Sequence, residues 1–366
     1  MKVLVVGMTT NPGGIEAVVM NYVNNVDPKR VQFDFLSTFP NIAYEDELLK
    51  RGSRVVHVPI RHEHPIKFRK QLNSFMDEHA KEYDAIWVHL CSLANIDTLK
   101  AAYKHGIPQR IIHCHNSRNM WGGGVREVMH KAHRKQITKY ATDYWTCSED
   151  AVEWFYGEGM KSNPRYAYIP NAINPKELAF DMQTRAKVRD AMGWNGKIVL
   201  GNVARMQPQK NQAFMLHALA PVLAPSSNVV LAILGDGALH ESLQQEAEEL
   251  GIAGNVQFLG LRKDIHDLYQ GMDAFVLPSK FEGVSMAFLE AQANGLTCLV
   301  SDTLSDEGIV NDNVFKLPIT PEGEQQWVDA VRQLDDSGNR TQHPQIAGSA
   351  HDIHEQMKKF YSRLRH

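Results

Sequence analysis

The feature that most constrains this chain is a rhythm of short apolar runs separated by helix-length segments, which occurs twice. In the first half the runs cover residues 2–6, 32–36, 54–58, 85–89, 110–113 and, more weakly, 144–147. After residue 175 they resume at residues 197–203, 229–234, 256–259, 274–277 and 297–300. Strands that alternate with helices predict a parallel sheet with helices on both faces. The sequence therefore predicts two doubly wound α/β domains.

A segment rich in Pro and Asn, residues 169–175, interrupts this rhythm and is predicted to link the two domains. The 366 residues also exceed what one hydrophobic core usually serves. We therefore expect a first domain over residues 1–172, a second over 173–348 and a C-terminal helix over 349–366. Apolar residues such as Ile353, Met357 and Phe360 follow near-helical spacing there, which predicts an amphipathic helix that crosses back to the first domain.

Composition narrows the class of protein. A hydrophobic fraction of 43% and a charged fraction of 22% are typical of a soluble globular protein. The net charge of −3 does not favour a nucleic-acid partner. The four cysteines are scattered without metal-ligand spacing, which favours reduced thiols and a cytoplasmic location. The first apolar run is short for a signal peptide, and no run reaches the ~20 residues of a membrane span, so any membrane association is expected to be peripheral, at the inner face of the cell membrane.

The loop after the first predicted strand contains Gly13 and Gly14 and enters a helix at Ile15. Glycines at a helix N-terminus let backbone amides approach a phosphate closely. The same residues also suit an ordinary strand-to-helix turn. Neither a GxGxxG nor a GxxxxGK[ST] pattern is present, so the loop alone does not distinguish a phosphate site from an ordinary turn.

Two cations, Arg205 and Lys210, follow the first strand of the second predicted domain. Open α/β sheets bind ligands at the carboxyl ends of their strands. Fixed Arg and Lys can neutralise a diphosphate leaving group. No Asp-x-Asp pair is available to hold a divalent ion, so these cations are favoured over a metal. Solvated surface charges are the alternative.

Glu282 and Glu290 stand eight positions apart, around the start of a helix predicted near Val284. Backbone N–H groups at that helix start can face a sugar and a phosphate. One carboxylate can accept hydrogen bonds from ribose hydroxyls and the other from hydroxyls of a second sugar. Two ordinary surface glutamates on a capped helix are the alternative.

This pair resembles the E-x7-E motif of family 4 glycosyltransferases, which have the two-domain GT-B fold with a cleft between the domains. Other landmarks agree in order over nearly the whole chain: residues 13–16, 113–117, 169–174, Arg205 with Lys210, and 235–237. Within the family the chain is most similar to exopolysaccharide and capsule enzymes of the EpsF-like type. The resemblance implies metal-independent, retaining transfer of a hexose or N-acetylhexosamine. The donor would be a nucleotide-diphosphate sugar, expected to be a UDP-sugar, and the acceptor a saccharide or a lipid-linked saccharide.

The resemblance also implies roles for individual residues. Arg205 and Lys210 would hold the donor diphosphate, Glu282 the donor sugar and Glu290 the ribose. His115 would lie near the reacting sugar, with His113 as the competing choice. The remaining donor-binding positions are Gly13, Gly14, Leu261, Arg262, Gly283, Val284 and Ser285. No cofactor and no metal are implied, because the acceptor hydroxyl would attack on the leaving-group side and pass its proton to a donor phosphate oxygen.

Two departures from the family pattern concern the linker, with Ala172 where Gly is usual and Asn174 where Asp is usual, and Val284, where Phe is common. The second leaves the identity of the donor sugar open. The acceptor is expected to bind the first domain, with loops 42–64 and 116–125 shaping specificity. Basic stretches at 61–70 and 126–139 suggest contact with an anionic membrane, although a solvated helix face is an equal alternative. Two alternative functions stay open: a nucleotide-sugar epimerase, and a non-catalytic nucleotide-sugar binder or scaffold protein.

Overall fold

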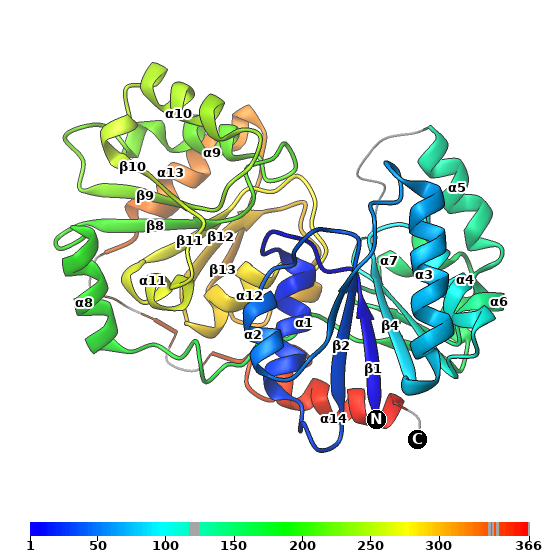
Figure 1. The fold of residues 1–366 in the computed structure, drawn as a ribbon. Coiled ribbons are helices and arrows are strands. Elements are labelled where there is room, and N and C mark those ends of the chain that lie inside the picture. Colours follow the sequence, from blue (N-terminus) through cyan, green and yellow to red (C-terminus); the bar gives the residue numbers. More distant parts are fainter. Residues whose placement is uncertain (117–123, 336–337, 339, 342–343, 365–366) are drawn as a thin grey trace. The chain divides into compact units, whose positions relative to one another are not determined.

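The computed structural model describes residues 1–116, 124–335, 338, 340, 341 and 344–364 (Figure 1). Contacts divide the chain into two compact units. Unit 1 comprises Met1–Ala172 with Ile353–His366, and unit 2 comprises Ile173–Asp352. Among the described residues, no helix combines the length and apolar character needed to cross a lipid bilayer.

Unit 1 is built on a parallel sheet of seven strands in the order β3-β2-β1-β4-β5-β6-β7. The strands are β1 (Lys2–Val6), β2 (Gln32–Ser37), β3 (Val55–His57), β4 (Ala85–Leu90), β5 (Gln109–Cys114), β6 (Asp143–Thr146) and β7 (Tyr166–Tyr168). The helices are α1 (Gly14–Asn25), α2 (Glu45–Lys50), α3 (Pro65–His79), α4 (Asp97–Lys104), α5 (Val125–Arg134), α6 (Ile137–Tyr140), α7 (Ala151–Tyr156) and α14 (Ile353–Arg363).

The two faces of this sheet have different cores. Side chains of a strand alternate between faces, so Leu4, Ile86 and Ile112 belong to the cluster that α3, α4 and α7 cover. The opposite face is aromatic and is covered by α1 and α14 (Figure 1). On that face Phe360 of α14 lies 5.3 Å from Trp87 between ring centroids. The last helix therefore completes the core of unit 1.

Unit 2 has a six-stranded parallel sheet in the order β10-β9-β8-β11-β12-β13. Its strands are β8 (Ile198–Val203), β9 (Val229–Leu234), β10 (Val256–Gly260), β11 (Ala274–Leu277), β12 (Thr297–Ser301) and β13 (Val314–Leu317). Its helices are α8 (Met182–Met192), α9 (Gln212–Leu219), α10 (His240–Glu249), α11 (Ile265–Gly271), α12 (Met286–Ala293) and α13 (Glu324–Arg332). The predicted architecture of two parallel-sheet α/β domains is confirmed, and the prediction lacked β7 and β13.

Each sheet contains one point where the strand order reverses. In unit 1 the reversal lies between β1 and β4, and in unit 2 between β8 and β11. Open α/β sheets bind ligands at such points, outside the carboxyl ends of the strands. In unit 2 the pairing of the two strands joins Ala274 with Leu200 and Phe275 with Gly201. Beyond these pairs the side-chain amide of Asn202 donates to the Val276 carbonyl at 2.8 Å.

Candidate functional site

The loops that follow β8 and β11 meet at the reversal point of unit 2. Lys210 Nζ lies 2.5 Å from Glu282 Oε1, and both side chains are largely buried. Gln209 joins the same loops, because its Nε2 donates to the Phe281 carbonyl at 2.8 Å and its own carbonyl accepts from the Lys280 amide at 2.9 Å. The structure therefore brings two predicted residues that are 72 positions apart into direct contact.

Arg205 stands in the same loop as Lys210 and is exposed. Within the described parts of the chain its guanidinium has no recorded partner, whereas its carbonyl accepts from Gln212 Nε2 at 3.2 Å. The backbone of Gly237 packs directly against this loop. Gly237 has φ +159°, and a Cβ added to it would lie 2.3 Å from the Met206 carbonyl oxygen. A fixed backbone thus carries a cation that is available to an anionic ligand.

Glu290 lies on α12, and its Oε2 accepts from the hydroxyl of Tyr269 at 3.0 Å. Burial raises the pKa of the Glu290 carboxyl, an effect that His266 and the Tyr269 hydrogen bond partly offset. Burial also raises the pKa of the Tyr269 phenol, so it acts as a donor here. Glu290 is therefore a positioned carboxylate on a helix that starts beside Glu282.

The segment between the two glutamates caps this helix. The prediction placed the helix start near Val284, whereas α12 begins at Met286 with Ser285 as its N-cap. The difference arises because Ser285 keeps an extended backbone, φ −70° and ψ 129°, as N-cap residues do. The Val284 side chain is buried, so Val284 can offer a ligand only its backbone, whereas the half-buried Ser285 side chain makes no capping hydrogen bond.

Leu261 and Arg262 follow β10. Leu261 is an exposed large apolar residue. Arg262 forms a two-pronged ion pair with Asp264, with Nε 2.8 Å from Oδ1 and the terminal nitrogen 2.6 Å from Oδ2. The guanidinium is thus paired with a neighbour two positions further along the chain.

In unit 1, Gly13 is the N-cap of α1 and Gly14 is its first residue. A Cβ at Gly14 would meet nothing within 4 Å, so no internal contact requires glycine there. The preceding loop is pinned by the buried Glu16, whose Oε1 accepts from the amide and the hydroxyl of Thr9 at 2.7 and 2.9 Å. An ordered loop with open space at a helix N-terminus suits an anion.

Three histidines gather at the carboxyl ends of β4 and β5, on the sheet face that α1 covers. His89 Nδ1 lies 2.8 Å from His115 Nε2, and the His113 ring centroid lies 4.5 Å from that of His115. Burial lowers the pKa of His115 to about 3. Burial, reinforced by His115, also holds the pKa of His89 and of His113 well below the ordinary value of histidine. All three rings are therefore neutral at physiological pH.

The histidine cluster has the composition of a metal site, because its nitrogen atoms lie within 4.8 Å of one another. The rings of His89 and His115 are stacked, 25° from parallel, and their nitrogens are at hydrogen-bond distance. Two nitrogens on one tetrahedral zinc ion are about 3.3 Å apart, given Zn–N bonds of about 2.0–2.1 Å. The geometry fits a shared proton better than a shared metal.

The sequence reasoning missed three residues that organise these sites. His89 is the last but one residue of β4, as His113 is of the adjacent β5, and this common place near two strand ends was a usable signal. Gln209 and Tyr269 carried none, because their roles depend on contacts with residues 72 and 21 positions away. Ser117 and most of the predicted acceptor loop 116–125 lie outside the described residues.

The basic stretch 126–139 differs from its prediction. His130 and His133 are buried, because His130 Nδ1 accepts from the Leu93 amide at 3.0 Å and His133 Nδ1 lies 2.7 Å from the Leu93 carbonyl. The prediction that these two histidines belong to an exposed basic face is therefore wrong. The exposed residues of α5 include Val125, Arg126, Val128 and Lys131, so the outer face of this helix is both apolar and basic.

Comparison with known proteins agrees with this architecture. Residues 184–350 match the family described as glycosyl transferases group 1. The chain is 32% identical over 311 residues to the "putative glycosyltransferase EpsF" of Bacillus subtilis (strain 168), covering 84% of this chain and 80% of that protein. It is 30% identical over 170 residues to an Escherichia coli UDP-Gal:alpha-D-GlcNAc-diphosphoundecaprenol alpha-1,3-galactosyltransferase, covering 45% of this chain and 42% of that protein.

Among solved structures, the fold is similar to that of Anabaena HepE in complex with UDP and glucose. The TM-score is 0.77 at 18% identity, over 100% of this chain and 99% of that one. It is also similar to WaaG, a glycosyltransferase involved in lipopolysaccharide biosynthesis, with a TM-score of 0.70 at 17% identity over 90% of each chain. These likenesses establish the fold.

Proposed function

This chain belongs to the group 1 glycosyltransferases, and we propose that it transfers a hexose or N-acetylhexosamine from a UDP-sugar, with retention and without a metal. The proposed acceptor is a saccharide or a lipid-linked saccharide used in exopolysaccharide, capsule or related glycan synthesis. A UDP-sugar is favoured because HepE, which shares the fold, binds UDP and glucose, and the Escherichia coli relative uses UDP-Gal.

The observation that carries the proposal is the group formed by Arg205, Lys210 and Glu282 at the reversal point of unit 2. An ammonium has three N–H donors. The Lys210 ammonium directs one of them to Glu282, which leaves two for phosphate oxygens. Arg205 adds a planar fork suited to a diphosphate. Glu282 retains lone pairs for hydroxyls of the donor sugar, so the group can bind both halves of a sugar diphosphate.

The proposed mechanism uses these charges to stabilise the departing diphosphate. Arg205 and Lys210 neutralise it as the glycosidic bond breaks, and the acceptor hydroxyl passes its proton to a donor phosphate oxygen. Losing one such preorganised contact typically removes about 3 kcal/mol of barrier lowering, or roughly a hundredfold in rate. His115 contributes a neutral ring that hydrogen-bonds sugar hydroxyls without adding charge. Glu290 is proposed to bind the ribose, and Gly14 and Leu261 to flank the diphosphate and the base.

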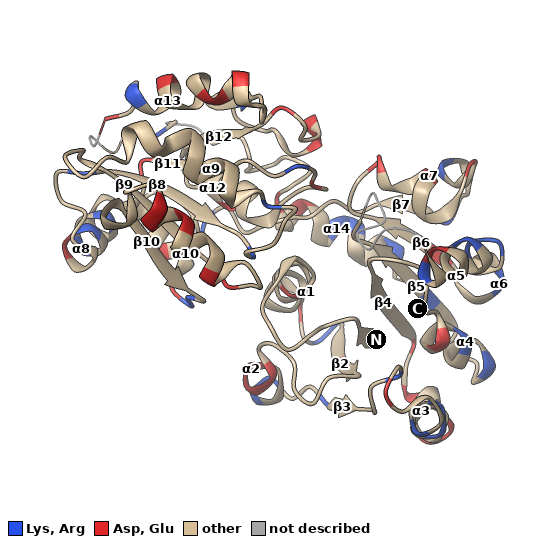
Figure 2. Ribbon diagram, turned by 90° about the horizontal axis from the view of Figure 1, so that it is seen from above, with Lys and Arg blue, Asp and Glu red and all other residues tan. Residues whose placement is uncertain are grey.

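A membrane-bound acceptor is part of the proposal because of the outer face of unit 1. Lys and Arg gather on α5 and α6 and along α3 (Figure 2). On the same helices, Ile66 of α3 and Val125 and Val128 of α5 are 83%, 79% and 66% exposed. Basic residues near an anionic bilayer contribute ~1 kcal/mol each, and apolar side chains can enter the interface. Such a face would keep the enzyme at the inner surface of the cell membrane.

Co-sedimentation with vesicles of phosphatidylcholine and phosphatidylglycerol tests this face. The wild type should bind at low salt, and the double variant Val125→Asp, Val128→Asp should not. Binding that depends on neither the anionic lipid nor the salt concentration would remove the membrane from the proposal.

The function itself is tested by donor hydrolysis and transfer across UDP- and GDP-sugars with EDTA present. One donor should turn over without metal, and Arg205→Ala and Glu282→Gln should each lower that rate at least a hundredfold. Arg332→Ala, an exposed arginine of α13, is the matched control and should leave it unchanged. The anomeric configuration of the product, read by NMR, tests retention. Donor binding without turnover on any acceptor would favour a nucleotide-sugar binder instead.

A further inference from the structure

Four hydrogen bonds of unit 2 form a closed ring that includes the ends of α11 and α12. The Tyr269 hydroxyl donates to Glu290 Oε2 at 3.0 Å. The Glu290 carbonyl accepts from the Asn294 amide at 3.0 Å, and Asn294 Oδ1 accepts from Arg340 Nε at 3.1 Å. A terminal nitrogen of Arg340 donates to the Tyr269 carbonyl at 3.3 Å. The ring therefore connects Glu290 to a guanidinium that lies at the far end of both helices.

Two guanidinium groups cap the C-terminal end of α11. The last four carbonyls of a helix have no partner within it, and the negative end of the helix dipole favours cations. Arg185 donates to the carbonyls of Gln270 and Met272 at 3.1 and 2.8 Å. Arg340 donates to the same two carbonyls at 3.3 and 2.5 Å. Both arginines thus hold the end of α11, and Arg340 also holds α12.

The backbone beside Arg340 packs against the end of α12. The Thr341 amide donates to the Gly295 carbonyl at 3.0 Å. Gly295 has φ +78°, and a Cβ added to it would lie 2.9 Å from the Thr341 carbonyl oxygen. The guanidinium of Arg340 lies 4.6 Å from the centroid of the Phe180 ring. Burial, with a smaller effect of Arg185, lowers the pKa of Arg340 to about 9, so the group stays charged at neutral pH and its hydrogen bonds are charge-assisted.

We infer that Arg340 is a positioning residue for the nucleoside part of the donor. By joining the ends of α11 and α12, it fixes the place at which the Tyr269 hydroxyl meets the Glu290 carboxylate. Without the guanidinium the two helices should still pack on the sheet, but the hydrogen bond between these two side chains should loosen. The inference rests on the proposed function, in which Glu290 binds the ribose. Arg340 acts through Glu290, so the ribose hydroxyls report its effect.

The probes are UDP and 2′,3′-dideoxy-UDP, measured by calorimetry on the full chain. Because these nucleotides differ in the ribose hydroxyls alone, the ratio of their dissociation constants reports how well Glu290 is placed. The wild type should bind UDP at least tenfold more tightly than dideoxy-UDP. Arg340→Met should reduce this ratio to threefold or less by weakening UDP, and should leave the binding of dideoxy-UDP unchanged. A general loss of stability would weaken both nucleotides alike.

Two further variants guard against a loss of folding. A lysine can meet the carbonyls of α11 as a point charge, but it lacks the planar fork that reaches two helices. Arg340→Lys is therefore the milder change and should lower the ratio at least twofold. Arg340→Ala should regain the wild-type ratio when guanidinium is added, at a concentration far below that which unfolds the protein.

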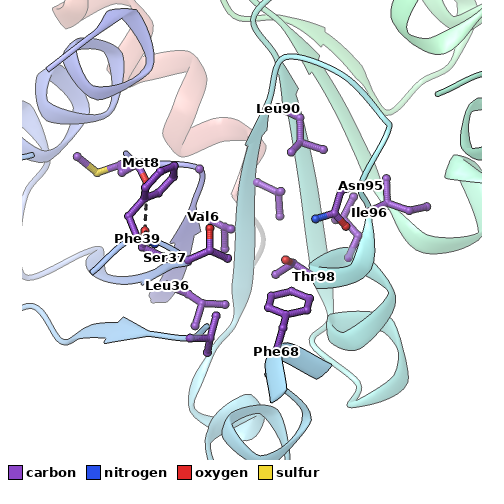
Figure 3. A pocket seen from close by; sticks show the side chains of 15 residues that line it. Val6, Met8, Leu36, Ser37, Phe39, Phe68, Leu90, Asn95, Ile96 and Thr98 are labelled. Atoms are coloured by element: carbon purple, nitrogen blue, oxygen red, sulfur yellow. Dashed lines mark hydrogen bonds between the residues drawn. The ribbon is translucent and has the colours of Figure 1, made fainter. Parts of the chain in front are cut away.

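A double variant tests whether Arg340 acts through the ring. Tyr269→Phe opens the ring at the hydroxyl and should lower the ratio as Arg340→Met does. Because both changes act on Glu290, the double variant should lose no more than either single variant. Arg185→Met is the matched control, since it removes the other guanidinium from the same helix end, and it should keep the ratio. Thr98→Val, in a pocket of about 150 Å³ in unit 1 (Figure 3), should keep it as well.

The outcomes separate this inference from the proposed function. A folded Arg340→Met or Arg340→Lys protein that keeps the ratio of the wild type would overturn the positioning role alone, and so would an equal loss in Arg185→Met. If the wild type binds UDP and dideoxy-UDP equally, Glu290 does not bind the ribose and the inference falls with that role. A ratio that Arg340→Met abolishes, in a protein whose wild type transfers no sugar to any acceptor, supports the positioning role and refutes the proposed transferase.

Discussion

His89 Nδ1 and His115 Nε2 share one proton across 2.8 Å, at the ends of two neighbouring strands. The bond commits Nε2 of His115 to the protein and leaves Nδ1 as the ring nitrogen that can face a ligand. His89 is itself fixed by ring contact with Trp87, 4.3 Å away between centroids. His89 is therefore a positioning residue for the histidine that the family resemblance places near the reacting sugar.

The first prediction follows from this bond. His89→Phe keeps a ring but removes the nitrogen partner, so His115 becomes free to rotate. We expect kcat to fall about tenfold, roughly 1.4 kcal/mol of barrier, while KM for the donor changes little. His89→Asn places an amide near the position of Nδ1 and should recover much of the loss. Equal losses in both variants would show that His89 serves packing only.

The second prediction concerns acid stability. His89, His113 and His115 are neutral when folded, with pKa values below the unfolded value near 6.5. Below pH 6.5 the unfolded chain binds more protons, so the free energy of unfolding falls as pH falls. For His115 this loss is about 2 kcal/mol at pH 5 relative to pH 8. This loss continues toward the folded pKa, about 3 for His115.

Urea unfolding between pH 8 and 5, followed by pulsed hydrogen exchange in peptides from β4 and β5, measures this dependence in unit 1. His113→Phe should reduce the slope of the free energy of unfolding against pH by the contribution of about one proton. His62→Phe, at an exposed position, should leave that slope unchanged. An unchanged slope in His113→Phe would mean that the ring is already protonated in the folded state or not buried in solution.

The third prediction tests the carboxylate proposed for the ribose. Tyr269→Phe deletes the hydroxyl that donates to Glu290 at 3.0 Å. We expect a five- to tenfold rise in KM for the donor with little change in kcat, and a loss of about 1 kcal/mol of stability. Tyr144→Phe is the control, because it deletes a buried hydroxyl that donates to a carbonyl, that of Ala141 at 3.0 Å, and Tyr144 lies in unit 1. If both variants behave alike, Glu290 has no special link to the donor.

The fourth prediction separates a ligand requirement from a folding requirement at Gly14. A Cβ there meets no atom of the protein within 4 Å, and Ala favours a helix more than Gly. Gly14→Ala should therefore unfold no more readily than the wild type, yet donor turnover should fall at least tenfold because the methyl group occupies the space proposed for a phosphate. Gly254→Ala, also free of contacts, should keep full turnover. Normal turnover in Gly14→Ala would take the helix N-terminus out of the site.

Strands that are buried on both faces, such as β1, β4, β9 and β11, were readily predicted from the sequence. Such strands read as continuous apolar runs. β7 was missed because only Ala167 of its three residues is buried, so it gives no apolar run, and β13 because it carries the exposed Phe315 and Lys316. The exposed positions break the apolar run that a parallel strand ordinarily shows.

Only part of the candidate site could be predicted from the sequence. Lys210 and Glu282 could each be placed at the carboxyl end of a strand, but their contact depends on β8 and β11 being neighbours, which strand positions alone do not specify. The hydrogen bond from Tyr269 to Glu290 depends in the same way on how α11 packs beside α12.

The placement of α14 in unit 1 has a consequence for how the chain is made. Synthesis runs from residue 1 toward residue 366, and domains ordinarily fold as they emerge from the ribosome. Here all of unit 2 emerges before Phe360, which covers Tyr22 and Trp87. The half of the molecule that is translated first is therefore the last to be completed, and a ribosome that stops short of residue 353 releases a chain whose aromatic face is still open.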